Sequence, residues 1–274
     1  MSRERNRIAA ILGLVMALSC GSVAQTRAET AVIPASADNT LYQNDQGSVS
    51  NGTGQHLFVG NNSQGNTRRA VLRFQIDGMV PDGAVVESVS LMMYVSQANA
   101  GPMSVNLRAL TNAWGEGSSD APGPEGSGAM AADQDATWLH RFFPTMTWNS
   151  PGGDFSPNIS AQAVVEAPGY YLWTGSKSSM PTSIMLADVQ QWVDRPDLNF
   201  GWLLMGEEDG FSNAKRFNSR NHPDDQLHPM LTIEYAVPQQ VPAVSTWGLV
   251  ILALTLLTLA KLRTVTPDRQ AATE

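Results

Sequence analysis

Aromatic side chains near predicted loops are the first residues in this chain whose type suits a binding chemistry. The apolar face of an indole or phenol ring can stack on the C–H face of a sugar ring. Trp138 and Trp173, with Tyr170 and Tyr171, lie nearest to loops and are the candidates for such stacking. Four other tryptophans fall at strand ends or on core faces, and we expect them to pack in the core: Trp114, Trp148, Trp192 and Trp202.

Carboxylates are the second group that could do chemistry. The segments Asp133-Gln-Asp135 and Glu207-Glu-Asp-Gly210 offer the hard oxygen ligands that calcium prefers, but the 12-residue calcium loop is missing. We therefore predict no cofactor and leave a structural calcium ion open. The chain has no His-Glu-x-x-His or Gly-x-Ser-x-Gly motif. Two carboxylates suffice for a glycosidase, so sequence alone leaves a polysaccharide-degrading enzyme open, but it predicts no catalytic residue.

The charge of the body argues against nucleic acid as a partner. Residues 31–237 carry 10 Lys and Arg against 21 Asp and Glu, a net charge of −11, whereas the 274-residue chain carries −8. An acidic body cannot bind phosphate backbones by releasing their counterions. The body also has no cysteine, because Cys20 is the only one in the chain, so its stability cannot come from disulfides.

The elements that must position these side chains are predicted to be strands. Val89, Leu91, Met93 and Val95 alternate with polar or intermediate residues, and the residues from 70 to 76 alternate in the same way. Many short strands separated by Gly, Asn, Asp and Pro turns favour an all-β fold, a single antiparallel β-sandwich of jelly-roll type with long loops. A short helix is expected over 188–194, with Asp188 as its cap, and a long surface loop over 115–136.

The N-terminus has the three parts of a secretory signal peptide. A basic leader ending at Arg7 is followed by the apolar run Ile8–Leu18 and by small residues. We predict a signal peptide over 1–24, cleaved between Ala24 and Gln25, and a leader segment over 25–36. The predicted partners are the Sec export machinery and signal peptidase.

The C-terminus carries a second apolar segment. We predict a linker and sorting motif over 237–246, a transmembrane helix over 247–263 and a basic cytoplasmic tail over 264–274. Pro242, Ser245, Trp247 and Gly248, followed by the apolar run and the basic tail, resemble the C-terminal sorting signals of the Pro-Glu-Pro and Ile-Pro-Thr-Leu type. That resemblance implies recognition by a membrane-embedded sorting transpeptidase of the exosortase type.

The body resembles the DNRLRE domain family, a β-sandwich of secreted proteins that is related to carbohydrate-binding modules. The resemblance covers nearly all of residues 37–236 and is carried by ordered segments: Ala37-Asp-Asn-Thr-Leu41, Arg69-Ala-Val-Leu-Arg-Phe74, Trp114-Gly-Glu-Gly117, Ala187-Asp-Val-Gln-Gln-Trp-Val193 and Arg216-Phe-Asn-Ser-Arg220. Asn221 and His228 depart from the pattern, which usually has Glu and Arg there. Arg73 and Arg220 are expected to pair with carboxylates such as Asp188 or Asp38.

Together these observations predict an exported, surface-anchored, non-catalytic module that binds or scaffolds at the cell envelope or in an extracellular polysaccharide matrix. The expected partners are a polysaccharide and, through the C-terminal helix, the membrane. The alternatives are a purely structural surface protein without a small ligand and a polysaccharide-degrading enzyme.

Overall fold

The alternation of apolar residues along the predicted strands appears in the structure as an alternation of burial. In the computed structural model, which describes residues 27–178, 183–238 and 253–257, Val89, Leu91 and Met93 are buried while Ser90 and Met92 between them are half-buried. Successive side chains of a strand point to opposite faces, so one face of this strand lies in a core. The predicted period of two is confirmed here.

Two sets of antiparallel strands make up the body. The strands of the first sheet are β1 (Arg27–Tyr42), β3 (His56–Asn61), β5 (Val85–Ala98), β11 (Gly169–Ser176), β13 (Lys215–Asn218) and β14 (Met230–Val237). The strands of the second sheet are β4 (Thr67–Phe74), β6 (Met103–Ala109), β10 (Ala161–Val165) and β12 (Trp202–Met205). Two short pairs lie outside these sheets, β2 (Val49–Ser50) with β7 (Ala129–Met130), and β8 (His140–Phe142) with β9 (Met146–Thr147).

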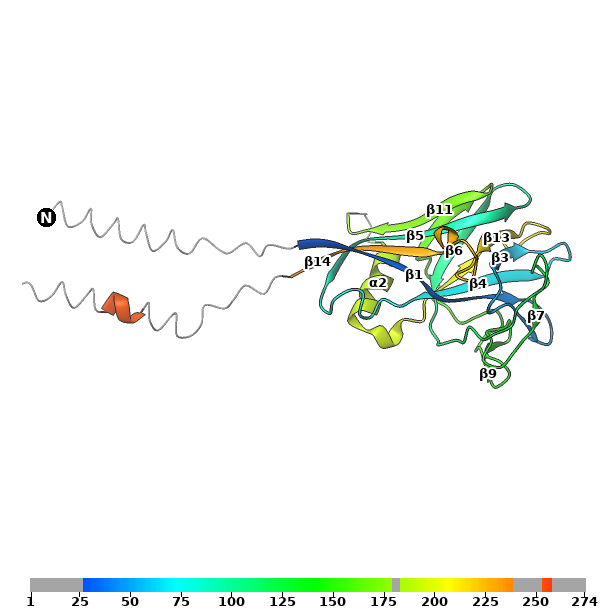
Figure 1. Cartoon of the computed structure of the whole chain (residues 1–274), viewed down its shortest axis with the longest axis horizontal. Coiled ribbons are helices and arrows are strands. Elements are labelled where there is room, and N and C mark those ends of the chain that lie inside the picture. The colour runs from blue at the N-terminus through cyan, green and yellow to red at the C-terminus, as the bar shows by residue number, and fades with distance from the viewer. Residues whose placement is uncertain (1–26, 179–182, 239–252, 258–274) are drawn as a thin grey trace, which may run out of the picture. The chain divides into compact units, whose positions relative to one another are not determined.

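Two strands pass from one sheet to the other. The first half of β1 pairs with β14, and its second half pairs with β4 after an irregularity between Ala35 and Ala37. Residues 56–59 of β3 pair with β13, whereas Gly60 and Asn61 pair with β4. Neighbours run in the order β1-β14-β5-β13-β3-β4-β12-β6-β10, with β11 on β5. In Figure 1, β1 and β14 lie side by side along the body. This arrangement supports the predicted all-β sandwich.

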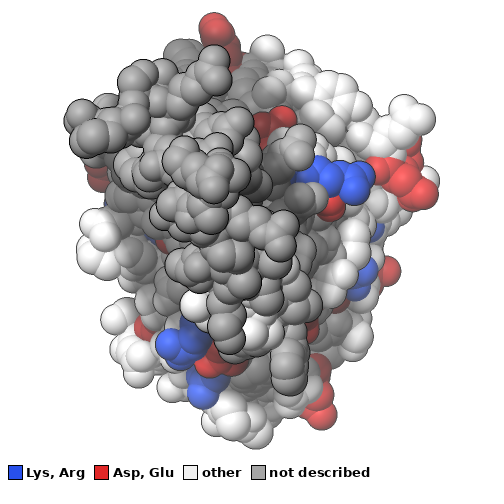
Figure 2. Space-filling model, turned by 90° about the vertical axis from the view of Figure 1, so that its left-hand side faces the viewer, with Lys and Arg blue, Asp and Glu red and all other residues white. Residues whose placement is uncertain are grey.

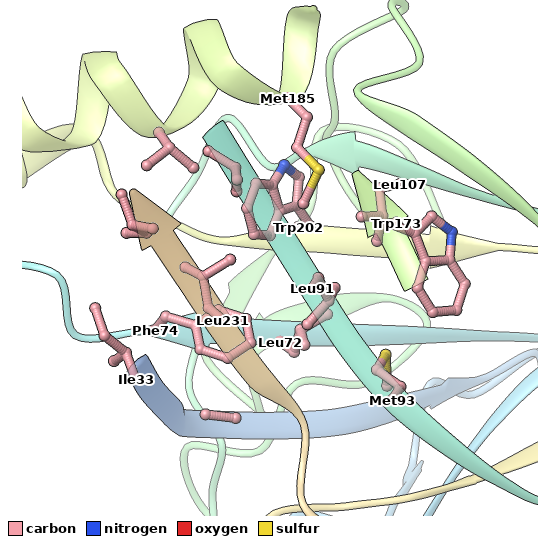
Figure 3. Close-up of a cluster of buried hydrophobic side chains, with 14 of the residues drawn as sticks. Ile33, Leu72, Phe74, Leu91, Met93, Leu107, Trp173, Met185, Trp202 and Leu231 are labelled. Carbon is pink, nitrogen blue, oxygen red and sulfur yellow. The ribbon is translucent and has the colours of Figure 1, made fainter. Parts of the chain in front are cut away.

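The main core lies between the two sheets. Leu91 and Leu231 come from the first sheet, and Leu72, Phe74 and Trp202 come from the second; all are buried in one cluster (Figure 3). The Trp202 ring lies 6.3 Å from that of Phe74 and donates a hydrogen bond of 3.0 Å from Nε1 to the Asp188 carboxylate. A buried indole N–H needs such a partner, so this hydrogen bond offsets the free energy of removing the Trp202 N–H from water.

A second hydrophobic cluster covers the outer face of the second sheet. Val71 and Leu203 of β4 and β12 pack there against Trp114, Trp138 and Trp148 of the long segment between β6 and β10. The predicted surface loop over 115–136 is therefore only partly a surface element, since Ala121 and Ala136 are buried. No comparable cluster covers the outer face of the first sheet within the described residues.

The main helix of the body, α2 (Ile184–Asp194), packs on the core through Met185, Val189 and Trp192. It begins earlier than predicted, because Ser183 and not Asp188 is its N-cap; the Ser183 hydroxyl accepts a hydrogen bond from the Leu186 N–H. Two 3₁₀ helices follow, η1 (Pro196–Leu198) and η2 (Asp225–Leu227).

The folded body spans residues 27–237 as one compact unit. Residues 27–36, assigned from the sequence to a leader segment, form the first part of β1. The predicted signal peptide, its cleavage site at Ala24 and Gln25, and the sorting-motif residues Pro242, Ser245, Trp247 and Gly248 lie outside the described residues. Of the predicted transmembrane segment, 253–257 are described, as helical. None of the helices among the described residues has the length and apolarity that a membrane crossing requires.

Candidate functional site

Three side chains form a row on the uncovered outer face of the first sheet. Arg216 of β13 lies opposite Phe58 of β3 on one side and Gln97 of β5 on the other. Directly opposed residues on antiparallel strands face the same side of a sheet. Lys215 and Phe217, on either side of Arg216, are fully buried, so the row must face outward.

This row lies in a cleft of about 340 Å³, within the usual range for small-ligand sites. Residues of four loops, around positions 62, 99, 125 and 212, contribute to its lining. Its lining combines apolar, polar and arginine side chains and, among the described residues, includes no acidic one: Phe58, Asn61, Asn62, Ser63, Arg68, Gln97, Asn99, Pro124, Gly126, Ser127, Ser212, Ala214 and Arg216.

Two guanidinium groups supply the charge of the cleft. Arg216 is held by a hydrogen bond of 3.0 Å from Nε to the Ser96 hydroxyl. Neither of its terminal nitrogens has a hydrogen-bond partner among the described residues, and no carboxylate there pairs with it. Arg216 therefore presents two parallel N–H donors, the arrangement that binds a carboxylate in a bidentate manner.

Arg68 is more deeply placed than Arg216. Its guanidinium lies 5.0 Å from the centre of the Tyr42 ring, and Nη1 donates to the Thr67 carbonyl at 3.1 Å. Burial lowers the pKa of this guanidinium, although arginine stays protonated in proteins. Its buried Nε has no partner. Arg68 also lacks a carboxylate partner among the described residues, so its charge is not neutralised within the body.

One rim of the cleft is held by Asn61. Its Nδ2 donates to the carbonyls of Glu208 and Gly210 at 2.7 and 3.0 Å, and its N–H donates to Oδ1 of Asn213 at 2.6 Å. Gly60 is required beside it, because its φ is +104° and a Cβ there would lie 2.8 Å from Oδ1 of Asn213. The loops before β4 and β13 are thus locked together at the cleft.

A buried lysine holds the opposite rim. Lys215 is fully buried, and its Nζ donates to the carbonyls of Asn99 and Gly101 in the turn after β5. Burial lowers the pKa of Lys215. Because its hydrogen bonds go to carbonyls rather than to a ligand, this lysine positions the rim and is not itself exposed in the cleft.

The third rim comes from the segment around Glu125, whose carboxylate points into the body. It accepts hydrogen bonds from the Asn51 side chain and the His56 N–H, both at 2.9 Å. Burial acts to raise the pKa of Glu125, but the hydrogen bond with the His56 ring at 3.2 Å, together with those from Asn51 and the His56 N–H, outweighs it, so the net shift is downward. Glu125 is therefore committed to structural contacts, and its neighbours Pro124 and Gly126 line the cleft without bringing negative charge into it.

The lack of acidic lining contrasts with the rest of the body. The body has about twice as many acidic as basic residues, and on the face shown in Figure 2 the basic side chains have acidic ones close by. Two uncompensated arginines in one cleft thus form a local site for a negatively charged group.

Trp173, one of the four predicted stacking residues, lies in the core instead. It is fully buried, its ring lies 6.2 Å from that of Phe217, and Nε1 donates to the Val105 carbonyl at 2.9 Å (Figure 3). Its place on β11 gives the physical reason, because Tyr170, Leu172 and Thr174 take the outward positions of that strand. This placement corrects the prediction, since no face of the ring is open to a ligand.

Trp138 is also largely buried, under the Arg69 guanidinium, which lies 4.9 Å from the ring centre. Arg69 lines a second cleft of about 450 Å³ with Asp154 and Phe155. Its charge is already satisfied there, because Nε and Nη2 bind the Glu208 carboxylate at 2.7 and 2.8 Å. Arg69 is therefore not available to pair with an acidic ligand, unlike Arg216 in the first cleft.

The two predicted tyrosines have different surroundings. The Tyr171 hydroxyl accepts from the Glu166 and Ala167 N–H groups and donates to the Ala167 carbonyl, so it closes the turn before β11. Tyr170 faces outward, is 52 % exposed and packs edge-on against Tyr94. Tyr170 is the predicted stacking residue that remains accessible.

The tryptophans predicted to pack in the core do so, whereas the two arginines predicted to pair with carboxylates differ in outcome. Trp114, Trp148, Trp192 and Trp202 are buried, as predicted. Arg220 pairs with Glu116 at 2.5 and 2.6 Å rather than with the side chain of Asp38, which accepts from the Arg220 N–H instead. The prediction for Arg73 was wrong, because among the described residues it pairs with no carboxylate and its guanidinium lies over the Trp114 ring instead. Among residues 27–178, 183–238 and 253–257, no three His, Cys, Asp or Glu side chains gather as a metal site.

Sequence reasoning missed the cleft because its residues are distant along the chain. Phe58, Arg68, Gln97 and Arg216 come from four strands, and only pairing register brings them together. The one signal was the segment Arg216-Phe-Asn-Ser-Arg220, which carries part of the family resemblance.

A comparison with protein families bears on this cleft. A model of carbohydrate-binding module family 96 matches residues 29–121. The matched stretch runs from β1 into the segment after β6 and includes Phe58, Arg68 and Gln97, but not Arg216. The similarity supports a domain of carbohydrate-binding type, a class of non-catalytic module. No curated protein shows a significant match to the chain.

Proposed function

We propose that the body is a non-catalytic module that binds a polysaccharide carrying acidic groups, with the cleft around Arg216 as its site. The observation that carries the proposal is the pair Arg68 and Arg216, which lack carboxylate partners among the described residues and lie in a cleft without acidic lining. A carboxylate of the glycan would receive the terminal N–H groups of Arg216. The side-chain amides of Asn62 and Gln97 offer polar groups for sugar hydroxyls.

The proposed setting is the outer surface of the cell or its polysaccharide matrix. Its support is the predicted signal peptide over 1–24, the apolar segment over 247–263 and the resemblance to exosortase-type sorting signals. Binding and anchoring together would tether an extracellular glycan to the envelope. Deleting residues 238–274 should release the protein from the membrane fraction, and continued membrane retention would contradict the anchor.

A glycan array tests the binding function. The full-length protein, purified in detergent, is applied to polyuronates, sulfated glycans and neutral glycans. We expect retention on acidic glycans and little on neutral ones. Arg216→Gln should reduce the affinity about 10- to 100-fold, the loss expected for one charge-assisted hydrogen-bonded pair.

Arg195→Gln is the matched control, because Arg195 is exposed, pairs with Asp197 and does not line the cleft. The control should bind like the unaltered protein. Equal binding by Arg216→Gln and Arg195→Gln would remove this cleft as the site. If the unaltered protein is retained on no glycan, the result instead favours a purely structural surface protein.

A further inference from the structure

The outer face of the first sheet carries an aromatic pair beyond the cleft. Tyr94 of β5 and Tyr170 of β11 are directly opposed, and their ring centres lie 5.0 Å apart at an interplanar angle of 72°. Neither hydroxyl has a hydrogen-bond partner among the described residues. Two outward rings with free hydroxyls, one of them half exposed, have an apolar surface and a polar edge available together.

An apolar row adjoins this pair on the same face. Met230 of β14 opposes Met92 of β5, which in turn opposes Leu172 of β11. Leu172 is 54 % exposed, and the two methionines are half-buried. Exposed contiguous apolar surface of this kind marks an interaction site more often than single exposed residues do.

The aromatic pair is continuous with the cleft through the register of the sheet. Phe217 opposes Val95, so Arg216 and Tyr94 lie one residue to either side of that pair, on adjacent strands. Tyr170 lies one strand further, opposite Tyr94. With strands about 4.8 Å apart and about 3.3 Å per residue, the Cα atoms of Arg216 and Tyr170 are about 12–14 Å apart, the larger value following from the irregularity between Arg216 and Phe217.

We propose that Tyr94 and Tyr170 form a second subsite, on which a further pyranose ring of the same glycan stacks while an acidic sugar occupies the cleft. This inference rests on the proposed function and extends it: the ligand is an extended chain, in which one sugar pairs with Arg216 and another stacks on Tyr170. The occupant of the second subsite needs no charge, since the subsite is apolar with two hydroxyls. Its sugar ring would present its C–H face to Tyr170.

Chain length separates the two subsites experimentally. Isothermal titration of the full-length protein in detergent uses disaccharides and hexasaccharides of polygalacturonate, polyglucuronate and polymannuronate, chosen by the array result. Tyr170→Ala should reduce the affinity for the hexasaccharide about tenfold, because tyrosine is enriched among the residues whose truncation costs a binding site the most affinity. It should leave the affinity for the disaccharide unchanged. Arg216→Gln should reduce both.

Two further variants control for folding and for the ring itself. Tyr170→Phe keeps the ring and should retain most of the hexasaccharide affinity, whereas Val164→Ala, at an exposed position of the second sheet, should change nothing. A hexasaccharide affinity that Tyr170→Ala leaves intact while Arg216→Gln lowers it would overturn the second subsite and keep the proposed function. An equal loss for both lengths with Tyr170→Ala would also overturn it. Failure of the unaltered protein to bind any of these oligosaccharides would overturn the second subsite, and failure to bind every acidic glycan of the array as well would overturn both.

Discussion

The titration of Asp38 should make the stability of the body depend on pH. Asp38 lies on β1 with 1 % of its surface exposed. Its Oδ2 accepts from the Arg220 N–H at 2.7 Å, and its own N–H donates to Glu116 at 2.8 Å. Burial raises the pKa of Asp38 from 3.8 to about 7, an effect that the hydrogen bond from Arg220 opposes and the nearby Glu116 carboxylate strengthens.

The sign of the effect follows from proton binding. Between pH 3.8 and about 7 the folded state holds a proton on Asp38 that the unfolded chain has released. Stability therefore falls as pH rises through this window. A difference of about three pKa units at 1.36 kcal/mol each corresponds to at most about 4 kcal/mol.

Asp38→Asn removes this titration while keeping the shape of the side chain and an oxygen for the Arg220 N–H. Urea unfolding of both proteins at pH 4.5, 5.5, 6.5 and 7.5 measures the difference in free energy of unfolding, in which Glu116 and Arg220 are common to both. We expect the variant to be more stable by about 1 kcal/mol at pH 4.5, and by about 4 kcal/mol at pH 7.5. A difference that stays constant across the series would refute the burial argument.

Two further substitutions test the interior. Lys215→Met should lower the free energy of unfolding by about 2 kcal/mol, because two carbonyls of the turn after β5 lose their donor; an unchanged urea midpoint would contradict the role of Lys215. Trp173→Ala should cost about 3–5 kcal/mol, since the ring is fully buried. If thermal unfolding of that variant matched the unaltered protein while glycan binding disappeared, Trp173 would be a ligand contact after all.

The strands were the part of the fold most open to prediction. The alternation in β5 needs no knowledge of its neighbours, because a polar side chain at an inward position would be buried without a partner. In β4 the same reasoning was incomplete. The alternation over 70–76 indicates one covered face, yet Val71 on the opposite face is also buried, because the segment after β6 folds back over the second sheet.

The predicted start of the helix was wrong because Asp188 had two possible roles, to cap the helix or to bind side chains elsewhere in the fold. Asp188 is a good capping residue, but its carboxylate binds the Ser160 hydroxyl and the Trp202 indole within the fold. Ser183 caps the helix instead. A tertiary partner of Asp188, distant along the chain, thus decided its role.

The candidate site shows the same limit more strongly. Tyr170 could be proposed as a contact residue from the sequence because it is an aromatic side chain near a predicted turn. Trp173 was proposed on the same ground, but a shift of three positions along a strand reverses the direction in which a side chain points. Only the start of β11 and its pairing with β5 assign Tyr170 to the outside and Trp173 to the core.

The sequence by itself determined the class of the fold and the acidic balance of the body, because residue periodicity and charge are local or additive properties. Only the tertiary structure showed that two arginines line one cleft in which no described acidic side chain takes part. Arg68 and Arg216 are separated by nearly 150 residues. They share a cleft because β13 pairs with β3 and β5, and β3 pairs in turn with β4. Pairing between distant strands is a property of the whole chain, so no segment read alone contains it.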